Sequence, residues 1–377
     1  MFKTELKKAL YQKKLYAIVS ISMVIFIAFF FLNDTSNHLV EQKSLLYRSF
    51  KDEVYDEIEK LDQNKEISNE EKESIKNDYL VQYETILELI MAAETSNWQR
   101  ELESLNRLDE ENMTGSNYVY YTHLIEDELQ DETPFTRVEF RNYLMKHDIK
   151  PNSNQTKETA THFLLKVYED LLPMILPILI TCLSILCVHE EFSQKTYKFM
   201  FQMPYSRIRI ISSKLILSML AAFLLLSILL TISFFLPYSL NGIGYLNYPI
   251  NASPNLPFTF TIGDNSYIKA GHLLCMLVLI LPITTAFYSI YSCFIFILNS
   301  TPSSMVAALL IPFSFTAFSK LFSSFVFDVL PFTDVCHYKA FTANNFISPF
   351  LSIGILIISS LLLMISLFLT VKRKNFY

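Results

Sequence analysis

One short stretch of the chain, residues 189–214, contains side chains that could bind a metal, catalyse a reaction or contact a partner. It opens with His189-Glu190-Glu191, and histidine and glutamate are zinc ligands in metalloproteases. A zinc-binding helix of that class needs a second histidine at a fixed spacing, which is missing here. We therefore predict neither a metal site nor catalytic residues in this stretch.

The same stretch has the pattern of a short amphipathic helix. Ser193 can accept a hydrogen bond at the start of a helix, and Pro204 ends it. One face would carry polar and basic side chains, Gln194, Lys195, Lys198 and Gln202. The other face would carry Tyr197, Met200 and Phe201. Such a helix is expected to lie in the membrane interface, with its polar side toward the cytoplasm.

The composition excludes the common nucleotide-binding loops. The 377 residues include only 6 glycines, and neither a GxxxxGK[ST] nor a GxGxxG sequence occurs. Hydrophobic residues make up 51% of the chain and charged residues 18%, whereas a soluble domain has about 25% charged residues. The five cysteines fit neither a disulfide framework nor a zinc-binding pattern. We expect a membrane protein that binds no cofactor directly.

Six apolar segments are long enough to cross a membrane as helices, because a bilayer core of about 30 Å needs about 20 residues. They are Leu15–Leu32, Leu171–Val188, Leu215–Leu236, Ala270–Leu298, Ser304–Phe327 and Phe346–Val371. The first segment ends in Asn33-Asp34-Thr35 rather than in the small residues of a cleavage site. We therefore expect the first segment to be retained as a membrane span.

The distribution of basic residues sets the expected orientation. Residues 1–14, 189–214 and 372–377 together hold 13 lysines and arginines against three acids, a net charge of +10. Residues 33–170 hold 15 basic and 31 acidic residues, a net charge of −16. By the positive-inside rule, we expect a multi-pass protein of the cell membrane with both termini in the cytoplasm and residues 33–170 outside.

The long segment 33–170 is predicted to be helical. Its apolar residues recur at helical spacing, as in Leu46, Phe50, Val54 and Ile58. Thr133-Pro134 is a typical helix start, with a hydroxyl cap followed by proline in the first turn. The segment should therefore form a helical extracytoplasmic domain.

An acidic run from Asp52 to Glu73 has two open interpretations. It is either a solvated helical face or a docking surface for a cationic ligand, such as a basic peptide.

The predicted fold class is all-α, with six transmembrane helices and a helical extracytoplasmic domain between the first and second. The predicted parts are a cytoplasmic amphipathic helix 1–14, a transmembrane helix 15–32, the domain 33–170, a transmembrane helix 171–188, a cytoplasmic loop 189–214, transmembrane helices three to six within 215–371 with outer loops 237–269 and 328–345, and a cytoplasmic tail 372–377.

The loop 189–214 resembles the corresponding loop in the membrane subunits of ABC-2 type exporters. In that family the pattern reads roughly E-x-x-x-G-T, then two leucines, P-x-S-R and a later lysine. The matching residues here are Glu191, Thr196, Pro204, Ser206, Arg207 and Lys214. Lys195 replaces the family's glycine, and Phe199-Met200 stand where leucines are usual. Six spans with both termini inside, and a Lys-rich helix before the first span, also resemble this family.

The resemblance implies a type V exporter fold, in which residues 189–206 form a coupling helix seated on a separate ATPase subunit. ATP and Mg²⁺ would bind to that partner. The residues expected to couple to the ATPase are Glu190, Glu191, Thr196, Tyr197, Met200, Phe201, Pro204, Arg207 and Lys214. A second permease copy or a paralogous membrane subunit would complete the pathway within the lipid, and we expect no nucleic-acid partner.

Two functions from different classes fit these features. The first is the permease subunit of an ATP-driven exporter, without enzymatic activity of its own, that moves an amphipathic or hydrophobic substrate such as a lipid, a drug or an antimicrobial peptide. The alternative is a membrane receptor or scaffold whose acidic outer domain binds a cationic peptide and signals through residues 189–214. No pattern in the sequence identifies substrate-binding residues.

Overall fold

The computed structural model divides the chain into two compact units. The structure describes residues 13–33, 39–63, 67–114, 119, 129, 132–151, 158–189, 205–298, 306–312, 314, 338–342 and 349–373. The first unit, called here the membrane unit, comprises Met1–Phe31, Thr159–Thr259 and Ile268–Tyr377. The second, called the outer unit, comprises Leu32–Glu158 and Phe260–Tyr267.

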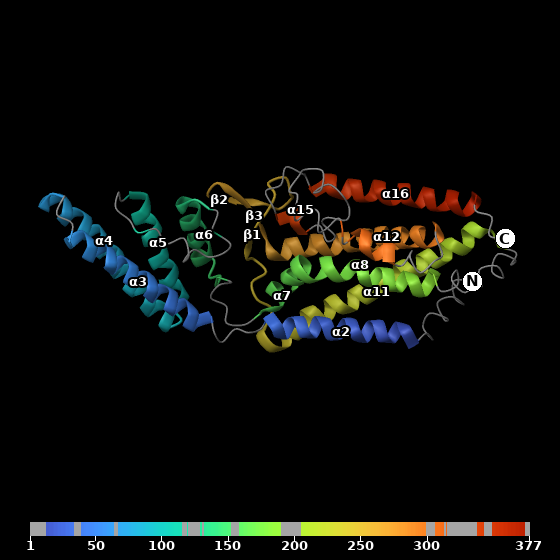
Figure 1. Cartoon of the computed structure of the whole chain (residues 1–377), viewed down its shortest axis with the longest axis horizontal. Coiled ribbons are helices and arrows are strands. Elements are labelled where there is room, and N and C mark those ends of the chain that lie inside the picture. The colour runs from blue at the N-terminus through green and yellow to red at the C-terminus, as the bar shows by residue number, and fades with distance from the viewer. Residues whose placement is uncertain are drawn as a thin grey trace. The chain divides into compact units, whose positions relative to one another are not determined.

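Long apolar helices make up the membrane unit (Figure 1). Among the described residues, five helices are long and apolar enough to cross a membrane. They are α2 (Lys13–Asn33), the continuous helix Ala160–Val188, α11 (Arg207–Asn241), α12 (Ala270–Leu298) and Phe350–Arg373 within α16 (Pro349–Arg373). The chain is therefore a mostly helical polytopic membrane protein. The predicted helix 1–14 and span Ser304–Phe327 lie largely outside the described residues.

The second span is longer than the predicted Leu171–Val188. It runs without a break through α7 (Ala160–Lys166), the π-helical turn η5 (Val167–Leu171), α8 (Leu172–Ser184) and a second π-helical turn, η6 (Ile185–His189). Pro173 lies in the first turn of α8, immediately after η5. Because proline supplies no N–H and crowds the preceding turn, a local widening of the helix accommodates it.

Helix α12 is the centre of the membrane unit. It contacts α8, α11 and α16, and α11 also contacts α7 and α8. One side of α12 is therefore buried along most of its length, whereas α2 and α16 leave large apolar side chains exposed, as lipid-facing helices do.

Among its described residues, the outer unit has four helices: α3 (Leu39–Gln63), α4 (Asn69–Glu94), α5 (Trp98–Thr114) and α6 (Pro134–Lys146). Each packs against the next along the chain. The predicted helix start at Thr133-Pro134 is confirmed, because the Thr133 hydroxyl accepts a hydrogen bond from the backbone N–H of Thr136 at 3.3 Å.

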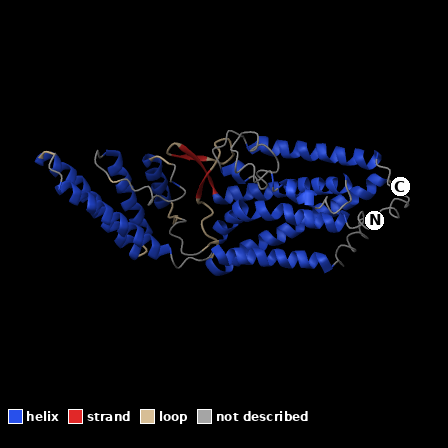
Figure 2. Ribbon diagram, viewed as in Figure 1, coloured by secondary structure: helices blue, strands red, loops and turns tan. Residues whose placement is uncertain are grey.

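Three short strands depart from the all-α prediction (Figure 2). They are β1 (Pro249–Asn251), β2 (Phe260–Ile262) and β3 (Asn265–Lys269), and they form one sheet in the order β1-β3-β2. Strands β2 and β3 pair antiparallel around the two-residue turn Gly263-Asp264, in which Gly263 has φ +57°. Phe260–Tyr267 of this hairpin belongs to the outer unit, although it is remote in sequence from the four helices.

Candidate functional site

Most of the predicted coupling loop lies outside the described residues. This applies to Glu190, Glu191, Thr196, Tyr197, Met200, Phe201 and Pro204. Arg207 and Lys214 are described, and both lie in the first part of α11. The site is therefore described from its two borders, η6 before the loop and α11 after it. We call the end of the bundle where η6 ends and α11 begins the loop end.

Helix α11 begins with a well-formed cap. Ser206 has extended backbone angles, and its Oγ accepts a hydrogen bond from the backbone N–H of Arg209 at 3.3 Å. The Arg209 guanidinium lies 5.5 Å from the centroid of the Tyr205 ring, a cation–π contact. Arg207 is the first residue of α11. The cap and the cation–π contact thus hold the backbone in place where the loop leads into the helix.

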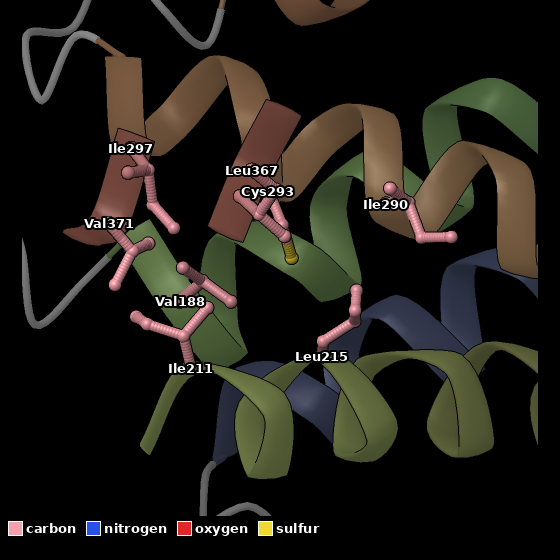
Figure 3. Packing of buried hydrophobic residues seen from close by; sticks show 8 residues of the cluster. All are labelled: Val188, Ile211, Leu215, Ile290, Cys293, Ile297, Leu367 and Val371. Atoms are coloured by element: carbon pink, nitrogen blue, oxygen red, sulfur yellow. The ribbon is translucent and has the colours of Figure 1, made fainter. Parts of the chain in front are cut away.

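An apolar cluster joins four helical elements at the loop end (Figure 3). Val188 comes from η6 and Leu215 from α11, while Cys293 comes from α12 and Leu367 from α16. The remaining buried members are Ile211, Ile290, Ile297 and Val371. Because a close-packed cluster resists deformation, a displacement of η6 or of the start of α11 would be passed to α12 and α16.

Lys214 is fully buried on the inner face of α11. Helical spacing places it on the face that also carries Ile211, Leu215 and Ser218, all of them buried. A buried ammonium is costly unless it is paired, so ionisable residues within membrane helices are functional candidates. Lys214 does have an interaction in the structure. Lys214, the last residue of the loop motif, therefore lies where burial makes a charged side chain unfavourable.

Two hydroxyl pairs, which the sequence analysis did not identify, connect helices just inside the loop end. The hydroxyls of Ser184 and Ser218 lie 2.8 Å apart and join α8 to α11. The hydroxyls of Thr181 and Ser292 lie 3.3 Å apart and join α8 to α12. Ser184 immediately precedes η6. The only signal in the sequence was the spacing of Thr181 and Ser184, three residues apart in an apolar segment.

The described borders of the loop are joined to the neighbouring helices by several kinds of contact. In the described part of the chain, no group of three His, Cys, Asp or Glu side chains could hold a metal ion. What the loop end does contain is a capped helix start, a buried lysine, two interhelical hydroxyl pairs and an apolar cluster. These features hold α8, α11, α12 and α16 together at the point where the loop is attached.

Comparison with known proteins identifies the family. The family model described as ABC-2 family transporter protein matches residues 1–335. No curated protein and no solved structure matches the chain. The matched range covers the loop 189–214 and the helices that border it. The chain therefore belongs to the ABC-2 family of transporter proteins and is a permease subunit of an ABC transporter.

Proposed function

We propose that this permease works in an ATP-driven exporter and that its loop 189–214 receives the movement of a separate ATPase subunit. The family implies association with an ABC ATPase, and such permeases generally lack a nucleotide-binding site of their own. ATP and Mg²⁺ would bind to that partner. The loop would then transmit the movement that hydrolysis produces to the membrane helices.

The observation that supports this proposal best is the packing at the loop end. The two ends of the loop continue directly into η6 and α11, and both contribute to the apolar cluster with α12 and α16. A push on an interfacial helix within the loop would move these helices together. In this proposal Glu190, Glu191, Thr196, Tyr197, Met200, Phe201 and Pro204 form the contact surface, while Arg207 and Lys214 connect it to α11.

An apolar or amphipathic substrate suits the interior of the bundle. Residues Leu215–Leu236 and Ala270–Leu298 contain no Asp, Glu, Lys or Arg. The buried polar groups of α8 and α12 are hydroxyls, such as Thr181, Thr284 and Ser292. A pathway for small ions would more often require buried carboxylates. A lipid, a drug or an antimicrobial peptide is therefore the proposed cargo, carried between this chain and a second permease copy or a paralogous membrane subunit.

Co-purification and uncoupling test the proposal. The chain is expected to co-purify with an ABC ATPase, which a receptor would not do. In proteoliposomes of that complex, Met200→Asp and Phe201→Asp should abolish stimulated ATP hydrolysis and efflux of a fluorescent amphipathic probe, because each places a carboxylate on the apolar face of the helix. Phe376→Asp, the same change in the tail 372–377, is the matched control. Full coupling in the Met200→Asp/Phe201→Asp double variant would contradict the assignment.

The proposed orientation has its own test. In a variant without the five native cysteines, single cysteines are placed at positions 64 and 372. A membrane-impermeant maleimide should label position 64 in intact cells and position 372 only after permeabilisation. The reverse pattern would show that both termini lie outside.

A further inference from the structure

The segment between α11 and α12 has an unusual composition for a loop. No Asp, Glu, Lys, Arg or His occurs from Leu215 to Gly263, which covers most of α11 and all of the following residues up to the β2–β3 turn. Residues 242–259, called here the aromatic loop, contain tyrosines, phenylalanine, prolines and asparagines but no charge. A loop of this length that faced water would normally carry charged residues.

Backbone hydrogen bonds fix the aromatic loop against the starts of two helices, α7 and α12. The Ala160 N–H at the start of α7 donates to the Gly242 carbonyl at 3.1 Å. The first two N–H groups of α12, from Ala270 and Gly271, donate to the Tyr248 and Leu246 carbonyls, each at 2.9 Å. The aromatic loop therefore lies at the level where α11 ends and α12 begins, at the end of the bundle away from the loop end.

Large apolar side chains remain exposed along this level. Those of the aromatic loop are Ile243, Tyr245, Leu246 and Phe258, and those at the end of α11 are Phe235, Tyr238 and Leu240. Closer to the loop end, α11 also exposes large apolar side chains, those of Ile228, Leu224 and Leu220. The exposed side chains of the loop are thus of the same apolar kind as those of α11, a helix long and apolar enough to cross a membrane.

Phe258 is held in a strained conformation with its ring outward. Its φ is +69°, in the left-handed region that bulky residues rarely adopt, and its side chain is 69% exposed. Its ring lies 5.2 Å from that of His272, in the first turn of α12. The Phe258 ring therefore neither fills the core nor favours its own backbone conformation, and it is placed to contact what surrounds the protein.

We propose that the aromatic loop is embedded in the lipid interface, with Phe258 inserted between headgroups and acyl chains. Aromatic side chains are enriched at this depth of a membrane, where polar backbone groups can stay hydrated and this loop has no charged side chain to remove from water. The partner is the bilayer itself, because the loop follows directly on a helix long and apolar enough to cross a membrane and exposes side chains of the same kind. This inference stands independently of the transport cycle proposed above.

Tryptophan quenching in proteoliposomes tests the proposal. The chain has one tryptophan, Trp98, so Trp98→Phe/Phe258→Trp gives a single probe in the loop. In phosphatidylcholine vesicles that contain lipids brominated near the headgroup, we expect this probe to be quenched strongly, and acrylamide to quench it weakly. Trp98→Phe/Tyr55→Trp is the matched control, because Tyr55 is an exposed aromatic residue on the charged helix α3. The control should be quenched by acrylamide alone.

Three results would overturn the proposal. Strong acrylamide quenching without bromolipid quenching at position 258 would place the loop in water. Protection from both quenchers would show that protein covers the loop. Phe258→Gly separates lipid contact from folding: because glycine adopts a positive φ without strain, the variant should match or exceed the wild-type melting temperature in detergent. A clear loss there would show that the ring is needed for packing and would also contradict the proposal.

Discussion

The two units solve the problem of buried polar groups in opposite ways. In the outer unit, the fully buried carboxylate of Asp109 accepts hydrogen bonds from Arg137 and Arg141, with 2.6 Å from Arg141 Nη1 to Asp109 Oδ2. In the membrane unit, the hydroxyl pairs Ser184–Ser218 and Thr181–Ser292 join helices without charge, although Lys214 is buried there too.

The difference reflects what lies outside each unit. The outer unit carries charged residues over its surface, with exposed ion pairs such as Arg107–Glu88 and Lys76–Asp62. The membrane unit exposes side chains such as Leu279 and Leu362, which are 73% and 60% exposed. In the outer unit, Arg137 and Arg141 offset the cost of burying the Asp109 carboxylate. Charged groups are costlier to place within lipid, so hydroxyl contacts and close packing contribute more to joining the membrane helices.

The largest effect should follow removal of the buried carboxylate in the outer unit. Asp109→Ala leaves two guanidinium groups buried without their common acceptor, which should lower the free energy of unfolding by about 3–5 kcal/mol. Urea unfolding followed by the fluorescence of Trp98, at the start of α5 in the same unit, measures it.

Glu88→Ala is the matched control, since it removes a carboxylate that pairs with Arg107 at the surface. Its cost should stay below about 1 kcal/mol. Equal costs for the two variants would mean that Asp109 is not isolated from solvent.

A smaller effect is expected from a cavity in the membrane unit. Leu367→Ala empties part of the apolar cluster at the loop end. In water, such a substitution costs about 2–5 kcal/mol. We expect about 2 kcal/mol, because lipid surrounds the leucine in the unfolded state as well and only the packing contribution is lost. Resistance to unfolding by sodium dodecyl sulfate in bicelles measures this, and Ile365→Ala on the exposed side of α16 should cost little.

The interhelical hydroxyl pair should contribute less again. A double-mutant cycle of Ser184→Ala and Ser218→Ala should give a coupling energy of about 0.6 kcal/mol, the typical value for such bonds in membranes. Ser227→Ala is the control on α11, because Ser227 donates to the carbonyl of Phe223 within its own helix at 2.8 Å. Combining Ser184→Ala with Ser227→Ala should show no coupling. If the Ser184–Ser218 coupling energy exceeded the stability that Asp109→Ala removes, uncharged contacts would be the stronger ones and the comparison between the two units would be wrong.

The sequence predicted those parts that depend on local patterns. Helical periodicity and a cap predicted α6 from Thr133, and apolar runs predicted the helices that include Leu215–Leu236 and Ala270–Leu298. The β2–β3 hairpin was missed although its signal was present. Phe260 and Ile262 alternate with a polar residue, and Gly263-Asp264 is a two-residue turn typical of hairpins.

The contacts within the candidate site were not predictable in the same way. Ser184 and Ser218 are 34 positions apart, and Thr181 and Ser292 are 111 apart. Such pairs depend on how helices rotate against each other, which no local pattern determines. Lys214, by contrast, was found because its position after Arg207 matched a family motif, and its burial could be seen only in the structure.

The smallest expected effect concerns a half-buried acid of the outer unit and its dependence on pH. Burial raises the pKa of Glu111 above its ordinary value of 4.5, although the Thr85 hydroxyl, 3.3 Å from its Oε1, opposes the rise. The folded protein therefore binds more protons than the unfolded chain in this pH range. The free energy of unfolding should fall as pH rises from about 4.5 through the raised pKa.

Glu111→Gln should remove this fall and stabilise the outer unit at neutral pH by about 0.5 kcal/mol or less, because solvent screens a half-exposed group. Thr85→Val removes the hydrogen bond that lowers the pKa, so it should extend the fall to higher pH. Urea unfolding of the wild type and both variants across the acidic range, followed by Trp98 fluorescence, separates these outcomes. If Glu111→Gln destabilised the unit at neutral pH, the ionised carboxylate would be a stabilising partner. Even a half-buried acid would then follow the rule of the Asp109 cluster, in which the outer unit stabilises the charges that it buries.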